Sequence, residues 1–242
     1  MKLLQIMTAY HEAGHALVNL YTPGSMQLHK MTILPRGGAL GVTYQLPEMD
    51  AVSMEYKEYL AGIDVAMGGR SAEELVYGAE RVSSGISHDL HSATRTAYAL
   101  VTQFGFSEKL GSLDFASDYK NLSSHTKQEI ESEVRSIVEA ARSRSDTIIK
   151  TKRQELELLK DALMEYETLS REEIMLVIKG EKLVRVEPEV EQDGGEEKKD
   201  EPDRTRGTPT PPKKKETSNK GGVGIKIPEV LLPGTRRGGE GA

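Results

Sequence analysis

The sequence predicts a mainly α-helical domain with one small β hairpin or sheet element, followed by a disordered tail. Apolar residues recur at helical spacing over most of the first 183 residues, and β-type alternation is confined to about residues 26–46. The composition then changes abruptly. We therefore expect one folded domain over residues 1–183 and a disordered tail over residues 184–242.

The tail is predicted from what it lacks. Residues 187–242 contain no Phe, Tyr or Trp, yet they hold seven of the ten prolines and ten of the 23 glycines. Such a stretch cannot bury enough apolar surface to offset the entropy lost on ordering it.

The first half of the domain is predicted to open with a helix over residues 3–21, which ends at Thr22-Pro23-Gly24. Residues 26–34 and 41–46 are expected to form a two-stranded β unit with a Gly-rich connection. A helix over residues 53–67 should break at Gly68-Gly69, and a shorter one over residues 71–77 should end at Gly78.

The second half is expected to be helical throughout. Ser87 is a predicted N-cap for a helix that runs to about Phe104. A helical pattern then begins at Ser124 and continues for some forty residues, with a break indicated near residues 142–153. Ser170 to Glu173 form a predicted capping box for a last helix, closed by Gly180.

Composition limits the function classes. The chain has no cysteine, so disulfides and thiolate metal sites are excluded, and any metal must be bound by His, Asp or Glu. The net charge of −6 gives no reason to expect nucleic-acid binding. No apolar stretch approaches the length of a membrane span, so we expect none in this chain.

The most informative motif is His11-Glu12-Ala13-Gly14-His15 on the first predicted helix. Residues four apart lie on one face of a helix, so His11 and His15 can bring two imidazole nitrogens to one ion. Glu12 projects about 100° round the helix, where it can act as a general base towards water at the fourth coordination position of a zinc site. Gly14 is expected to leave the helix surface open beside the metal.

A catalytic zinc site needs a third protein ligand, and spacing alone leaves several candidates. Asp89 lies between His88 and His91 at the start of a predicted helix. Glu73 and Glu74 on the short helix before it are the alternatives, since a Glu completes many sites with two His ligands.

Several blocks of the chain resemble the peptidase domain of FtsH-type AAA proteases. These are residues 8–16, 32–37, 68–75, 87–94 and 166–169, which fall in the order and at the spacing of that family. The resemblance covers about residues 1–182. Within the family, residues 41–47 look most like the mitochondrial i-AAA (Yme-type) branch.

The resemblance implies a largely helical zinc endopeptidase that acts on unfolded polypeptides. It implies that Asp89 is the third ligand; the family commonly has Asn where this chain has His88, which could itself approach the metal. The family's β element offers an edge near the active site on which an extended substrate can pair. That edge implies a substrate-binding role for a short set of residues, namely Thr32, Ile33, Leu34, Gly37 and Gly38.

The resemblance also implies a larger assembly. Family members form hexameric rings beneath an ATPase ring, behind a membrane anchor, and the i-AAA branch is expected at the mitochondrial inner membrane facing the intermembrane space. No G-x-x-x-x-G-K-[ST] motif occurs here, so we expect this chain to hydrolyse no ATP. The alternative to an active endopeptidase is a ring-assembly module with little activity when separated from its ATPase.

Overall fold

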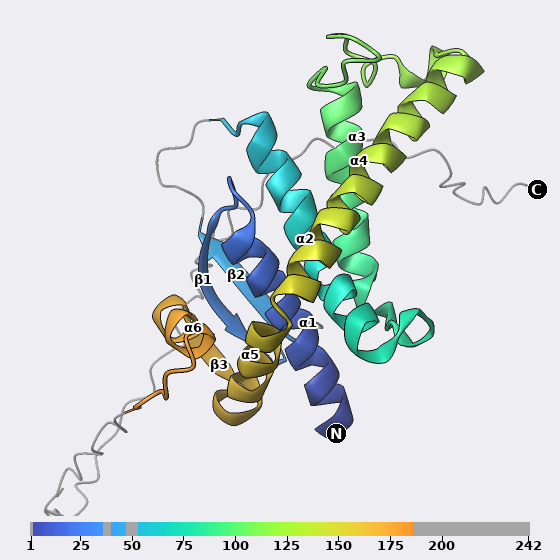
Figure 1. Cartoon of the computed structure of the whole chain (residues 1–242). Coiled ribbons are helices and arrows are strands. Elements are labelled where there is room, and N and C mark those ends of the chain that lie inside the picture. Colours follow the sequence, from blue (N-terminus) through green and yellow to red (C-terminus); the bar gives the residue numbers. More distant parts are fainter. Residues whose placement is uncertain (1, 36–39, 47–52, 186–242) are drawn as a thin grey trace, which may run out of the picture. The chain divides into compact units, whose positions relative to one another are not determined.

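A computed structural model describes residues 2–35, 40–46 and 53–185, and the elements below belong to the unit that ends at Leu183. The predicted tail lies outside the described residues from position 186 onward, as do Gly37 and Gly38. The helices are α1 (Lys2–Tyr21), α2 (Tyr56–Tyr77), α3 (Ser87–Thr102), α4 (Ser124–Thr151), α5 (Arg153–Tyr166) and α6 (Arg171–Ile178) (Figure 1). The strands are β1 (Gln27–Thr32), β2 (Val42–Leu46) and β3 (Thr168–Ser170). The mainly helical class with a small sheet is confirmed.

The sheet has three antiparallel strands in the order β2-β1-β3. Met31 in β1 lies opposite Thr43 of β2 on one side and opposite Leu169 of β3 on the other. The sequence did not predict β3, because a strand of three residues is too short for alternation to be recognised. Strand β1 is therefore central, and β2 and β3 are the edges.

Helix α2 corrects the prediction of a break at Gly68-Gly69, because it runs without interruption from Tyr56 to Tyr77. Its glycines lie where α2 crosses α1. A Cβ atom on Gly14 would be 2.4 Å from the Gly68 carbonyl oxygen, and one on Gly68 would be 2.7 Å from the Gly14 carbonyl oxygen. The prediction that Gly14 leaves an open surface is wrong for the same reason: Gly14 is buried against α2.

The other boundaries follow local sequence signals closely. The predicted break between two long helices is confirmed at Lys152, between α4 and α5. The capping box of Ser170 and Glu173 is confirmed at the start of α6, and Gly180 follows that helix with a φ of 78°. Ser87 is not an N-cap, because the preceding Ile86 is already helical at the end of a 3₁₀ turn.

Within the described part of the chain, two hydrophobic cores stabilise the fold, and α2 contributes to both. In the first, α1 packs against the sheet and α5, α6 packs against α5 and the sheet, and Leu17 is fully buried. The second lies between α2, α3 and α4 and includes Leu100 and Ile130. From α2, Val65 belongs to the first core and Met67 to the second, so this helix links the two (Figure 1).

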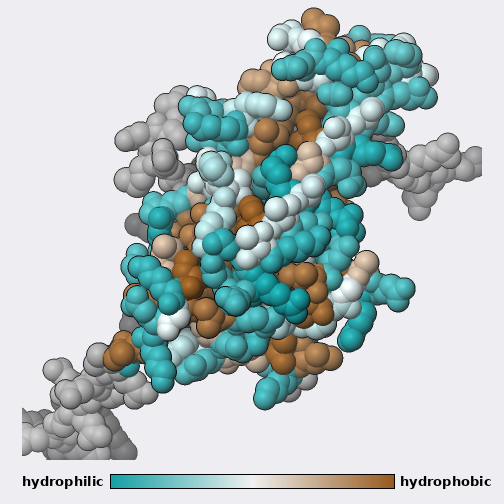
Figure 2. Space-filling view, in the orientation of Figure 1, coloured by the Kyte–Doolittle hydropathy of each residue, from teal (hydrophilic) through white to brown (hydrophobic). Residues whose placement is uncertain are grey.

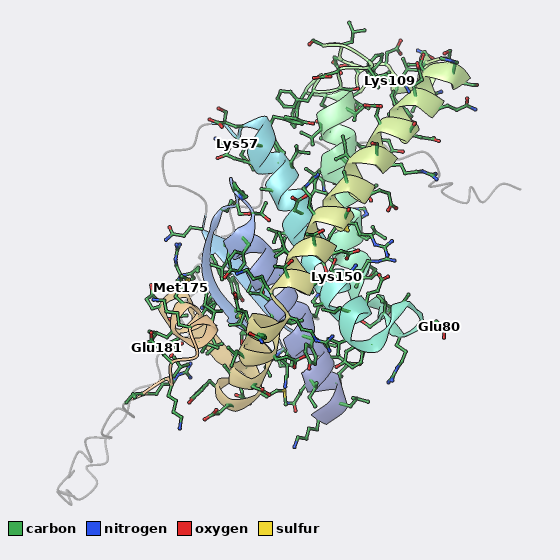
Figure 3. All side chains as sticks on the ribbon, in the orientation of Figure 1. Lys57, Glu80, Lys109, Lys150, Met175 and Glu181 are labelled. Atoms are coloured by element: carbon green, nitrogen blue, oxygen red, sulfur yellow. The ribbon has the colours of Figure 1, made fainter. Side chains whose placement is uncertain are left out.

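The surface seen in Figure 2 is mainly hydrophilic, with separate hydrophobic areas between the hydrophilic residues. In Figure 3 the labelled Lys57, Lys109 and Lys150 extend outward from α2, from the segment between α3 and α4, and from α4. Among the described residues, no helix combines the length and the hydropathy that crossing a membrane would require.

The helix crossing gives a first prediction. Gly68→Ala should lower the free energy of unfolding by about 1–3 kcal/mol, because the new methyl group meets the backbone of α1 and overpacks the crossing. Gly62→Ala is the matched control in the same helix, where an added Cβ meets nothing within 4 Å. It should raise stability by up to about 1 kcal/mol through helix propensity. Urea unfolding measures both, and a Gly68→Ala protein as stable as Gly62→Ala would contradict the packing argument.

Candidate metal centre

Three side chains from two helices bring one ligand atom each to a common point. His11 and His15 lie one turn apart on α1, with 3.0 Å between their Nε2 atoms. Asp89, in the first turn of α3, places Oδ2 at 3.2 Å from His11 Nε2 and 3.4 Å from His15 Nε2. Among the described residues, these three form the group whose ligand atoms lie close enough to hold one metal ion.

The orientation of His15 is fixed by the backbone of α2. Its Nδ1 lies 2.7 Å from the Val65 carbonyl oxygen in a buried hydrogen bond. A carbonyl oxygen can only accept, so Nδ1 carries the proton. In the neutral ring, the lone pair of Nε2 therefore faces His11 and Asp89.

His11 is oriented by a carboxylate. Its Nδ1 donates to Glu73 Oε1 at 2.8 Å, and Glu73 is only 2% exposed. The Ser83 backbone N–H donates to Glu73 Oε2 at 2.6 Å, and the Ser83 hydroxyl lies 3.1 Å from Oε1. Burial raises the pKa of Glu73, but the hydrogen bonds from His11 and Ser83 outweigh it and the pKa falls below its usual value. Glu73 thus connects α1, α2 and the segment that leads into Asp89.

The electric field at this point favours positive charge. Burial lowers the pKa of His11, but hydrogen bonds to Asp89 and Glu73 and the charges of Glu12 and Asp89 raise it to about 10. Burial likewise raises the pKa of Asp89, and hydrogen bonds from His11 and His15 outweigh it and hold that pKa far below its usual value. A cation at this position would be stabilised by the same carboxylates.

The donor set fits a divalent metal ion such as zinc. Ligand atoms bound tetrahedrally at about 2.0–2.2 Å lie about 3.3–3.6 Å apart. The three distances of 3.0, 3.2 and 3.4 Å are close to that spacing. Two imidazole nitrogens and one carboxylate oxygen are also ligands that zinc accepts, and each His donates its other ring N–H to an oxygen, as metal ligands usually do.

Glu12 lies beside this group but is held by different contacts. Its side chain is buried, at 5% exposure. The Thr43 hydroxyl in β2 donates to Glu12 Oε2 at 2.6 Å. A Cβ atom on Gly41, just before β2, would be 2.8 Å from both Glu12 Cγ and Glu12 Oε1. The start of β2 therefore surrounds the carboxylate that the sequence predicts as a general base.

The alternative ligands lie elsewhere. Glu73 contacts the far nitrogen of His11 and not the ligand atoms, so its role is to orient the imidazole. Glu74 accepts two hydrogen bonds from Arg142, at 3.0 and 2.9 Å. His88 is exposed and does not belong to the group. The geometry therefore favours Asp89 over the two glutamates.

The predicted substrate-binding residues lie at the end of β1. Thr32 pairs with Val42 on one side and Thr168 on the other, and Ile33 N–H donates to the Glu167 carbonyl at 2.9 Å. Leu34 is 41% exposed. The backbone of β1 is thus already paired, and the edge near Glu12 belongs to β2. Gly37 and Gly38 lie outside the described residues.

Sequence reasoning missed four contacts at this site: the Val65 carbonyl, Ser83, Thr43 and Gly41. The Val65 contact has no sequence signal, since every residue carries a carbonyl. Gly41 and Thr43 are within a block that resembles other proteins, and a glycine just before a strand is a known sign of close approach by another group.

Comparisons with known proteins place these residues in a wider context. A model of peptidase family M41 matches residues 3–177. The chain is 46% identical over 178 residues to an ATP-dependent zinc metalloprotease YME1 homolog of Schizosaccharomyces pombe, covering 74% of this chain and 25% of the relative. It is 46% identical over 176 residues to the mitochondrial inner membrane i-AAA protease supercomplex subunit YME1 of Saccharomyces cerevisiae, covering 73% and 24%. It is 41% identical over 186 residues to the ATP-dependent zinc metalloprotease FtsH of Caulobacter vibrioides, covering 72% and 30%. The chain thus spans about a quarter of the length of the first two relatives.

The contacts of Glu73 give a second prediction. Glu73→Gln should weaken zinc binding about 10- to 100-fold, the usual cost of losing an outer partner of a metal-ligating His. The His11 ring and the Ser83 backbone bind different oxygens of Glu73. In Gln one of these oxygens is replaced by an NH₂ group, which cannot accept a hydrogen bond. Calorimetric titration with zinc measures the affinity. Glu74→Gln, which removes the neighbouring charge, is the control and should bind zinc like the parent; equal affinities for all three proteins would contradict the orienting role.

Proposed function

The chain belongs to peptidase family M41, as its sequence blocks predicted, and on this premise we propose that it is a zinc-dependent endopeptidase domain acting on unfolded polypeptides. One observation carries the proposal: the Nε2 atoms of His11 and His15 and Oδ2 of Asp89 converge within 3.0–3.4 Å of one another, each His held by a second contact. Two surface histidines that lay four residues apart by chance would not need a hydrogen-bond partner on the other nitrogen of each ring.

In this proposal His11, His15 and Asp89 hold zinc. A zinc ion there would supply Lewis-acid chemistry, polarising a peptide carbonyl and lowering the pKa of water towards about 7. The Val65 and Glu73 contacts would orient both imidazole rings for binding the ion through Nε2.

Glu12 is the proposed general base. It takes a proton from the attacking water while the water oxygen bonds to the carbonyl carbon of the substrate. As the carbon–nitrogen bond breaks, Glu12 returns that proton to the amine nitrogen that leaves. Its burial supports this role, because a carboxylate shielded from bulk water transfers the proton within the site.

The substrate-binding role predicted for Thr32, Ile33 and Leu34 needs a different edge. Since β1 is paired on both sides at Thr32, we propose that an extended polypeptide pairs with the outer edge of β2, and Leu34 contributes exposed apolar surface. Strand β2 is supported as the pairing edge because its Thr43 side chain touches Glu12, which brings a paired substrate to the base.

The full-length protein is proposed to be a membrane-anchored, ATP-dependent protease for quality control of membrane proteins. Relatives about three times as long as this chain are named ATP-dependent zinc metalloproteases, and one is named as a mitochondrial inner membrane subunit. We propose the same membrane for this protein, with the peptidase domain facing the intermembrane space. We also propose that the full-length protein forms a hexameric ring and carries an ATPase that feeds unfolded chains to the peptidase domain.

A third prediction tests the peptidase itself. Glu12→Gln should retain zinc, measured by elemental analysis, but cleave casein at least about 100-fold more slowly than the parent. His15→Ala should lose both zinc and cleavage. His88→Ala is the control: it removes an exposed imidazole next to Asp89 and should keep both. Bound zinc in His15→Ala at the parental level would reject the metal site, and undiminished cleavage by Glu12→Gln would remove Glu12 from the mechanism.

The zinc and casein measurements on the parent chain, together with its mass in solution, also distinguish an active peptidase from the alternative function. A parent chain that binds one zinc ion but leaves casein intact, and that forms hexamers in solution, would instead be a ring-assembly module that depends on its ATPase for activity.

A fourth prediction tests the β2 edge. An unstructured peptide bound to the inactive Glu12→Gln protein should lose about 10- to 100-fold in affinity when alternate residues are N-methylated, because each hydrogen bond lost to the strand costs about 0.5–1.5 kcal/mol. Only one of the two alternating patterns should have this effect, since successive N–H groups of a strand point in opposite directions. Fluorescence anisotropy measures the binding, and equal affinity for both patterns would contradict pairing along β2.

A further inference from the structure

The contact between Thr43 and Glu12 is not needed to build the metal group, yet it is among the shortest at the site. Thr43 Oγ1 lies 2.6 Å from Glu12 Oε2 and 3.3 Å from the Glu12 carbonyl oxygen. A hydroxyl has one proton, so it donates to one acceptor at a time, and the shorter distance to the charged carboxylate identifies the stronger bond.

Both ends of this contact adjoin buried parts of the fold. Thr43 is opposite Met31, which is fully buried in the central strand. On the other side, Glu12 lies on a buried face of α1. Its side chain lies so close to Gly41 that a Cβ atom on Gly41 would overlap it. The carboxylate therefore has Oε2 bound by the hydroxyl and Oε1 against the Gly41 backbone.

We propose that Thr43 is a positioning residue that fixes the carboxylate plane of Glu12 for proton transfer during peptide hydrolysis. This inference rests on the proposed function, in which Glu12 is the general base. Thr43 touches neither the metal ligands nor their outer partners in the contacts described, so it should act on the chemical step and leave metal binding unchanged.

The test compares Thr43→Val, which keeps the branched shape but removes the hydroxyl, with Thr43→Ser, which restores it. With zinc-loaded protein and a fluorogenic peptide that the parent cleaves, Thr43→Val should lower kcat about 10- to 100-fold with KM little changed, the range expected when a catalytic group loses its alignment. Thr43→Ser should recover most of that loss. Zinc content should equal that of the parent in both variants.

A control distinguishes this role from a general effect on the sheet. Thr168→Val removes a hydroxyl from β3, the opposite edge strand, where Thr168 Oγ1 lies 2.7 Å from Thr32 Oγ1. It should lower stability without changing kcat. The proposal would be overturned if Thr43→Val changed KM alone or lost zinc. It would also be overturned if Thr43→Ser did not recover the lost kcat.

A second measurement does not depend on activity. Urea unfolding of metal-free parent, Thr43→Val, Glu12→Ala and the double variant gives the coupling between the two side chains, because Ala cannot accept the hydrogen bond from Thr43. We expect a clear non-additive effect, and strict additivity would show that the contact does not form. If the parent cleaves no peptide, the proposed function fails, while this cycle still decides whether Thr43 holds Glu12.

Discussion

The close crossing of α1 and α2 at Gly14 and Gly68 is the constraint on which the site depends. Without side chains at these two positions, the backbones approach until an added Cβ would lie 2.4–2.7 Å from the opposite carbonyl oxygen. At that separation the Val65 carbonyl oxygen lies 2.7 Å from Nδ1 of the His15 ring. The two glycines lower the intrinsic helix stability by about 1 kcal/mol each relative to Ala, and the packing of the two helices offsets that loss.

The same crossing places the ligand group between the two cores. Helix α1 belongs to the core that includes the sheet, α3 to the core that includes α4, and α2 to both. Glu73 makes the connection at the atomic level, because its carboxylate binds His11 on one side and Ser83, which leads into α3, on the other. His11 and Asp89 are thus held in place from separate cores, and the three candidate ligand atoms lie within 3.0–3.4 Å of one another.

The sequence predicted what depends on local periodicity and failed where tertiary contact decides. The spacing of His11 and His15 sufficed to place both on one helix face, and the capping signal at Ser170 located α6. Asp89 was assigned from family resemblance alone, because it comes from a helix more than seventy residues further along the chain. Gly68-Gly69 was interpreted as a break, since propensity alone disfavours glycine in a helix and the packing that favours it here is not visible in one segment.

The arrangement of α1 leads us to expect that mutations can separate the proposed metal binding from the proposed proton transfer. His11 and His15 share the face that meets α2 and α3, whereas Glu12, about 100° further round the helix, meets β2. The ligands are thus supported by helices and the proposed base by a strand. A change in β2 can displace the carboxylate without moving the imidazoles, and a change in α2 can weaken the metal site without touching the base. Strand β2 is also an edge of the sheet, so the strand that holds Glu12 is the one that we propose as the pairing edge for an extended substrate.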